Sequence, residues 1–105
     1  MPREGEIFRA LADETRRAIF ERLTHGEAAV KELTARFDVS QPAISQHLAA
    51  LRKAGLVTER KEGRLVFYRV EPAGLRPLVN WIEHYQAFWH ERLEKLKHLL
   101  KEMDK

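Results

Sequence analysis

The chain has 105 residues, 44% of them hydrophobic and 33% charged, with a formal net charge of +3, so it can bury one small core beneath a well-solvated surface. It contains no cysteine, which excludes disulfides, thiolate metal sites and cysteine nucleophiles. The N-terminus lacks the apolar run of a signal peptide, and no stretch of about 18 apolar residues could span a bilayer. We therefore expect a soluble, cytoplasmic protein that does not contact membranes.

Apolar residues at helical spacing predict three short helices in the first 40 residues. The first is expected over 6–11. The second is expected over 14–24, with Asp13 as its N-cap, and the third over about 28–37.

A short turn at 38–40 leads into a fourth predicted helix over 41–53. Ser40 is a good N-cap, Pro42 is tolerated in the first helical turn, and Gly55 is expected just past the helix end. Two amphipathic helices joined by so short a turn are typical of a DNA-reading helix pair, here spanning 28–54.

Two β-prone runs, 56–61 and 65–70, flank a loop that contains Gly63. They predict a β-hairpin over 56–70. A basic hairpin directly after the helix pair is interpreted as a wing, so the predicted fold is mainly α with a small β-hairpin. We expect a single winged helix–turn–helix domain over 1–105.

A long helix is expected over 77–103, which Pro77 either starts or kinks. Its apolar residues recur at steps of three and four, close to a heptad seam that one small protomer could hardly cover. We therefore predict a homodimer held by the terminal helices, and we favour this role for Trp81 and Trp89 over a ligand pocket. The predicted interface residues are Phe8, Leu78, Ile82, Tyr85, Trp89, Leu93 and Leu96.

The fourth helix carries the strongest functional signal. Ile44, Leu48 and Leu51 share its inward face, which leaves short polar side chains for the outside. Such groups can pair with base edges or phosphates, and the surplus of basic residues within 41–70 suits a polyanion, although charge alone favours an ordinary solvated face. The predicted DNA-binding residues are Ser40, Gln41, Pro42, Ser45, Gln46, His47 and Arg52, with Lys61 and Arg64 at the wing tip.

No constellation for catalysis is recognisable. Ser45 and His47 are two residues apart on a helix and face different directions, and neither a phosphate-binding loop nor a pair of buried carboxylates is predicted. We therefore expect no enzyme. The remaining alternative class is a helical adaptor, in which the long helix recruits another protein and the basic hairpin is incidental.

Residues 39–57 (VSQPAISQHLAALRKAGLV) resemble the recognition helix and first wing strand of the ArsR/SmtB repressors, and 8–19 and 63–69 resemble the same family. The resemblance implies a homodimeric repressor that binds an imperfect inverted repeat in double-stranded DNA. It assigns base reading and anchoring to the outer residues Ser40, Gln41, Ser45, Gln46 and His47. The Cys-Val-Cys metal sensor of the third helix is replaced by Ala-Val-Lys at 29–31, and Asp38 stands where the family usually has glycine. The effector is unknown.

Histidines on the last helix offer a weak alternative sensor. His90, Glu94 and His98 fall four residues apart on one face, a spacing that can chelate a metal. The family's last-helix zinc pattern begins with Asp-x-His, however, and the chain has Asn80 and Ile82 ahead of His84. We therefore expect no metal site and no cofactor, and keep a metal-responsive repressor as the alternative.

Overall fold

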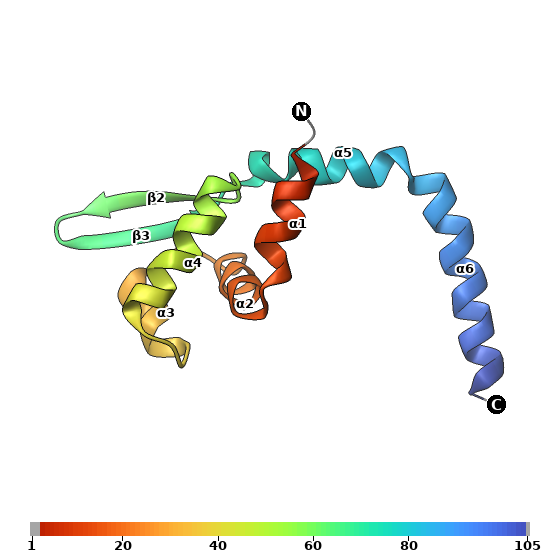
Figure 1. The fold of residues 1–105 in the computed structure, drawn as a ribbon, viewed down its shortest axis with the longest axis horizontal. Coiled ribbons are helices and arrows are strands. Elements are labelled where there is room, and N and C mark those ends of the chain that lie inside the picture. Colours follow the sequence, from red (N-terminus) through yellow and green to blue (C-terminus); the bar gives the residue numbers. More distant parts are fainter. Residues whose placement is uncertain (1–2, 105) are drawn as a thin grey trace.

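The computed structural model describes residues 3–104, apart from the side chain of Ala87. Helices dominate, and a small antiparallel sheet lies at one end of the molecule (Figure 1). In chain order the elements are α1 (Glu4–Ala12), α2 (Glu14–Leu23), β1 (Ala28–Ala29), α3 (Val30–Arg36), α4 (Gln41–Lys53), β2 (Val57–Glu62), β3 (Leu65–Val70), the 3-10 turn η1 (Pro72–Leu75), α5 (Arg76–His84) and α6 (Gln86–Met103). The predicted fold class, mainly helical with a hairpin, is confirmed.

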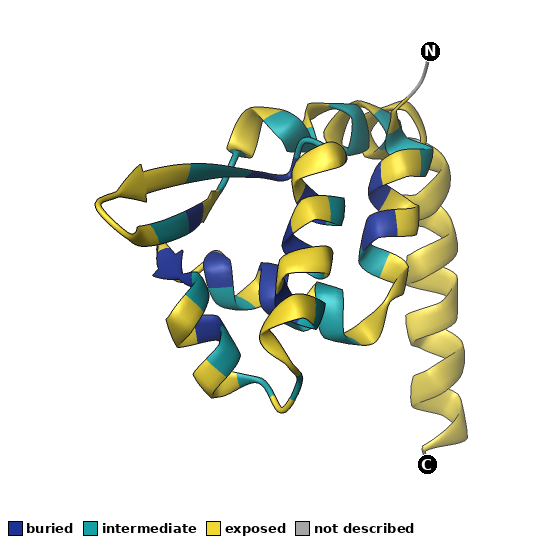
Figure 2. Ribbon diagram, turned by 60° about the vertical axis from the view of Figure 1, so that its left-hand side comes forward, coloured by how far each residue is buried: buried dark blue, intermediate teal, exposed yellow. Residues whose placement is uncertain are grey.

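One hydrophobic core joins the first four helices to the base of the hairpin. Its fully buried side chains are Ile7, Ile19, Leu33, Ile44, Leu48, Leu51, Leu56 and Val57. Figure 2 shows that the buried residues of α1, α2, α3 and α4 face one another, while α6 is exposed along its length. The core therefore fixes the orientation of α4 within the molecule.

Helix α4 begins and ends where the sequence predicts. The Ser40 hydroxyl accepts a hydrogen bond from the backbone N–H of Ala43 at 3.3 Å, which satisfies one of the free donors of the first turn. At the other end, Gly55 has a φ of 81°, and the N–H of Leu56 donates to the carbonyl of Leu51 at 3.0 Å. This left-handed glycine ends the helix and turns the chain into β2.

The sheet has three strands, not the two of the predicted hairpin. Ala28 and Ala29 were expected in the third helix, but they form β1, which pairs antiparallel with β3 opposite Tyr68 and Phe67. Helix α3 consequently begins at Val30, and the strand order is β1-β3-β2. The added strand ties the base of the wing to the start of α3.

The predicted long C-terminal helix is broken. Pro77 lies in the first turn of α5, so it starts this helix, and α5 ends at His84. At Tyr85 the backbone leaves helical geometry (φ −106°, ψ 9°), and α6 then leads away from the other helices (Figure 1). The prediction of one continuous helix over 77–103 is therefore wrong at Tyr85.

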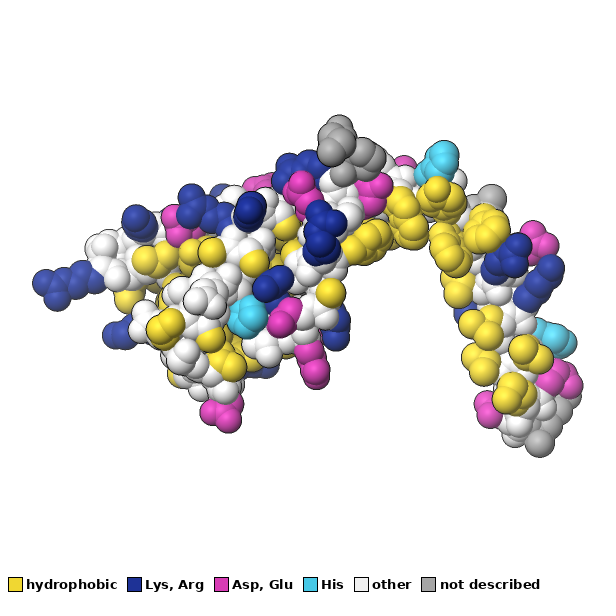
Figure 3. Space-filling model, viewed as in Figure 1, with side chains coloured by type: hydrophobic (Ala, Val, Ile, Leu, Met, Phe, Trp, Pro, Cys, Tyr) yellow, Lys and Arg dark blue, Asp and Glu magenta, His cyan; other side chains and the backbone are white. Residues whose placement is uncertain are grey.

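Large apolar side chains are exposed along α5 and α6. Figure 3 shows them on the side of these helices that faces the rest of the molecule. They are Val79, Ile82, Tyr85, Phe88, Trp89, Leu93, Leu96, Leu99, Leu100 and Met103. Leu78, also predicted at the interface, instead packs partly against the core. Phe8 of α1 is exposed too, and its ring lies 5.4 Å from that of Trp81 in an edge-to-face arrangement. Within residues 3–104, no helix is both long enough and apolar enough to cross a membrane.

Candidate nucleic-acid interface

The polar face of α4 is exposed because the apolar face of the helix packs into the core. Ile44, Leu48 and Leu51 are inaccessible to solvent. Four of the predicted DNA-binding residues are exposed at the start of this helix: Ser40, Gln41, Ser45 and Gln46. Pro42 is exposed as well. Because proline has no backbone N–H, it leaves no donor unsatisfied in the first turn of the helix. The structure therefore gathers hydroxyl and amide groups on one surface of the helix.

His47 is placed differently from the prediction. Its side chain is half-buried, and its Nδ1 atom is buried with no hydrogen-bond partner among the described residues. The ring lies near Asp13, the N-cap of α2. The hydrogen bond from the backbone N–H of Arg16 chiefly, and the electrostatic influence of His47 in addition, lower the pKa of the Asp13 carboxyl. His47 thus borders the junction of α1 and α2 as well as the surface of α4.

Arg52 is exposed to solvent, but its guanidinium already forms an ion pair within the protein. Its guanidinium bonds the Glu59 carboxylate on β2 at 2.8 Å, and the Tyr68 hydroxyl donates to the same carboxylate at 2.9 Å. Burial, and then this hydrogen bond, raise the pKa of Tyr68, so the hydroxyl stays a donor. The three side chains connect the last turn of α4 to the wing.

Two cations occupy the tip of the wing. Lys61 and Arg64 are exposed, and neither forms an ion pair within residues 3–104. Gly63 between them has a φ of 62°, a left-handed conformation that glycine adopts without a steric penalty. The turn therefore presents two free positive charges on a β-ribbon that projects from the molecule (Figure 1).

Arg60 joins the wing to the body of the molecule, a role that no sequence pattern predicts. Its Nη2 and Nε donate to the two carboxylate oxygens of Glu27 at 2.6 and 3.2 Å, and its Nη1 donates to Glu62 at 2.6 Å. The guanidinium also lies 4.6 Å from the centre of the Phe67 ring. Hydrogen bonding to Arg60 lowers the pKa of Glu27, and its two carboxylate partners raise the pKa of Arg60. The negative charge of Glu62 would oppose a phosphate contact at the tip. Within the protein, this charge is paired with Arg60.

A groove of about 400 Å³ separates α4 from the wing. Gln41 and Ser45 line it from α4, Lys31 from α3, and Arg64 from the wing. Lys31 is a further cation at this groove, and it was not among the residues predicted to bind DNA. Its position in the first turn of α3, directly after the strand that pairs with the wing, places it here. Glu59 also lines the groove, but its carboxylate is bonded to Arg52 and Tyr68. The groove thus combines hydrogen-bonding groups with two cations, which is the chemistry that recognises a nucleic-acid backbone and base edges.

The last-helix histidines do not form a cluster. His90, Glu94 and His98 are all exposed, and Glu94 pairs with Lys97 at 3.6 Å. Among the residues that the structure describes, no group of three or more His, Asp or Glu side chains could hold a metal ion.

Comparison with known proteins agrees with this geometry. A model of a helix-turn-helix domain matches residues 11–60. The HTH-type transcriptional regulator Rv2034 of Mycobacterium tuberculosis is 46% identical over 86 residues, which cover 82% of this chain and 78% of that protein. The arsenical resistance operon repressor of Escherichia coli is 48% identical over 68 residues, 64% of this chain and 58% of the repressor.

Solved structures give the same result over nearly the whole chain. An ArsR-like transcriptional regulator from Rhodococcus sp. RHA1 superimposes with a TM-score of 0.73 at 36% identity and covers 92% of each chain. These similarities agree with the exposed polar face of α4 and with the basic wing. The chain belongs to the ArsR family of helix–turn–helix regulators, and it is a DNA-binding regulator of transcription.

Proposed function

We propose that the protein is a homodimeric repressor that binds an inverted-repeat operator, without a cysteine metal sensor. The observation that carries the proposal is the exposed polar face of α4, held outward by three fully buried side chains, beside a wing with two free cations. Support for repression comes from the name of the E. coli relative, which is a repressor.

The base-reading role is assigned to the first turns of α4. Gln41 and Gln46 can each form two hydrogen bonds with adenine, and Ser40 and Ser45 can reach base edges or phosphates. Lys61 and Arg64 at the wing tip neutralise backbone phosphates. Arg52 contributes after release from Glu59, or indirectly by holding the wing, and His47 contributes from the edge of this surface.

The exposed apolar face of α5 and α6 supports the homodimer. Monomeric proteins rarely leave so long a run of large apolar side chains in water, and the run continues from Val79 to Met103. A two-fold axis through this face gives two copies of α4, which fit successive major grooves about 34 Å apart. Since each protomer adds its own phosphate contacts, the dimer binds more tightly and with a steeper salt dependence than a monomer.

Footprinting on the DNA that flanks the protein's own gene tests this function. We expect protection of two half-sites related by a dyad, and a reporter under that promoter should rise in expression when the gene is deleted. A fall in expression would identify an activator. Weak protection without sequence preference, or none, would favour the adaptor instead, and release of the operator by zinc would favour metal sensing.

A further inference from the structure

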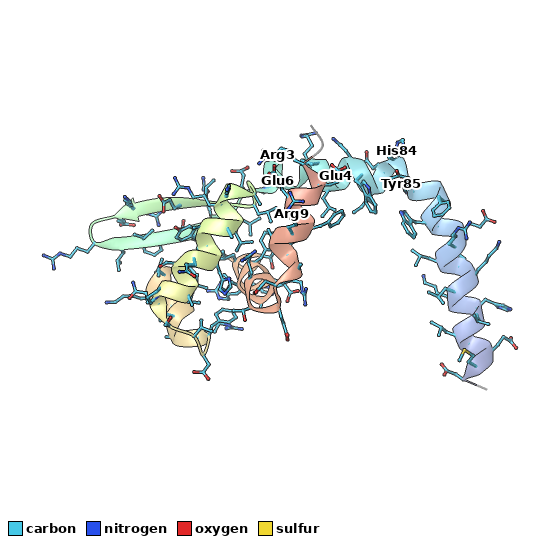
Figure 4. The ribbon with its side chains drawn as sticks, in the orientation of Figure 1. Arg3, Glu4, Glu6, Arg9, His84 and Tyr85 are labelled. Atoms are coloured by element: carbon cyan, nitrogen blue, oxygen red, sulfur yellow. The ribbon has the colours of Figure 1, made fainter. Side chains whose placement is uncertain are left out.

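A second group of cations lies away from the wing, at the opposite end of α4. A cleft of about 650 Å³ separates the C-terminal turn of α4 from α1 and α2. Arg3, Arg9, Arg16 and Lys53 line it, with Glu6 as its only acidic lining residue and with three alanines that leave the space open. Figure 4 shows Arg3, Glu6 and Arg9 together along the edge of α1 nearest the end of α4. Four cationic side chains and one carboxylate line the cleft, so its lining carries a net positive charge.

These cations are poorly neutralised by the protein itself. Within residues 3–104, Arg9 and Lys53 form no hydrogen bond or ion pair through their side chains. Arg3 bonds Glu6 at 3.3 Å, but both side chains are about half-exposed, so solvent screens the pair and an anion can replace it. The Nη1 of Arg16 donates to the carbonyl of Ala10 at 3.4 Å, whereas its Nε is buried without a partner. The guanidinium of Arg16 therefore makes one long hydrogen bond within the protein, and the residue still lines the cleft.

We propose that this cleft binds a phosphate group, contributed either by the backbone of bound DNA or by a small phosphorylated effector. Guanidinium groups match the oxygens of phosphate in pairs, and a dianion relieves the mutual repulsion of clustered cations. The N-terminus of α1 adds positive partial charge, which offsets the negative partial charge of the α4 C-terminus. The site is separate from the groove between α4 and the wing, and its first test does not depend on operator binding.

The first experiment titrates the full chain with inorganic phosphate at constant ionic strength and follows backbone amide shifts by NMR. We expect saturable shifts in 3–16 and 50–55 in the wild type. The double variant Arg9→Gln/Lys53→Gln should lose them. The control Lys101→Gln, which removes an exposed cation from α6, should keep them. Both side chains of the double variant lie on the surface, so thermal unfolding should show that it folds.

The second experiment separates the two sources of phosphate. Operator affinity is measured against salt concentration for the same three proteins. If the cleft takes a backbone phosphate, the slope of log K against log salt should fall by about 1 in the double variant, because each contact contributes about 0.9. If it takes a free effector, phosphate still saturates the wild type and the slope stays unchanged. A wild type without saturable shifts, combined with an unchanged slope, would overturn the proposal, and so would saturation that the double variant retains.

Discussion

Gln46 lies on the exposed face of α4, and its amide is free to pair with a base edge. Replacing it with alanine would remove the two hydrogen bonds to one base that we propose for it, and it would leave the buried face of the helix undisturbed. We expect Gln46→Ala to cost about 1–3 kcal/mol against the preferred operator and to relax selectivity at one base pair. Competition binding with single-base operator variants measures both effects.

His47, the next residue, is the matched comparison. Because its ring is half-buried beside the junction of α1 and α2, we expect His47→Ala to weaken binding to all sequences by a similar factor while selectivity is preserved. If His47→Ala altered selectivity and Gln46→Ala did not, the orientation that we propose for α4 in the major groove would be wrong.

Gly74 in η1 permits a close approach between two backbone segments. A Cβ at this position would meet the carbonyl oxygen of Gly55, which follows α4, so a side chain here forces the backbone to move. We expect Gly74→Ala to lower the free energy of unfolding by about 1–3 kcal/mol, as overpacking does. Urea denaturation measures the loss. Gly5→Ala is the control, because its Cβ would have room and alanine favours the helix α1, so this variant should be neutral or stabilising.

At the scale of the element, the wing is expected to act through charge alone at its tip. Arg64 is exposed, lies beside Gly63 and has no carboxylate partner among the described residues. Arg64→Ala should weaken binding to every DNA sequence alike and reduce the salt slope by about 1. A change in base preference, or a slope equal to that of the wild type, would contradict a phosphate contact.

The bond between Arg60 and Glu27 is one of the contacts that join the wing to the body, together with the pairing of β1 with β3. Since Arg60 lowers the pKa of Glu27, the ion pair stabilises the folded protein above the ordinary pKa of a glutamate. This stabilisation is lost as the pH falls through the lowered pKa of the folded state. Glu27→Gln should therefore increase the mobility of β2 and β3 at neutral pH, as measured by NMR order parameters. Lowering the pH should mobilise the wild-type wing but change the variant little, and equal rigidity in both proteins would show that other contacts hold the wing.

Some elements were predictable because local chemistry specifies them. Ser40, Pro42 and Gly55 mark both ends of α4, so its bounds follow from the sequence. β1 was missed because two alanines carry no strand signal, and only pairing with β3 makes them a strand. The break at Tyr85 was missed because neither proline nor glycine is present there.

The candidate site shows the same division between local and distant contacts. The outward position of Gln41, Ser45 and Gln46 follows from helical periodicity. The half-burial of His47 could have been anticipated, because it lies three residues after Ile44 and four before Leu51, at the edge of the buried stripe. The pairing of Arg60 with Glu27 joins residues 33 positions apart, so no local pattern predicts it.

At the scale of the whole molecule, we propose that the apolar face of α5 and α6 brings two copies of α4 to the DNA. Trp89 lies on this face, and its ring lies 6.3 Å from that of Trp81 across the break between the two helices. A carboxylate at position 89 would be desolvated in a dimer interface without a partner, which is strongly unfavourable. We expect Trp89→Asp to be monomeric in sedimentation analysis at concentrations where the wild type is a dimer.

The same variant should lose most of its operator affinity, because a monomer makes half of the phosphate contacts and cannot span two half-sites. His90→Asp is the control, since it adds the same charge to the neighbouring exposed position outside the apolar run. This control should remain dimeric and bind the operator, with a salt slope about twice that of the monomeric variant. A dimeric Trp89→Asp protein would place the interface elsewhere, and a monomer with full operator affinity would show that one copy of α4 and its wing suffices.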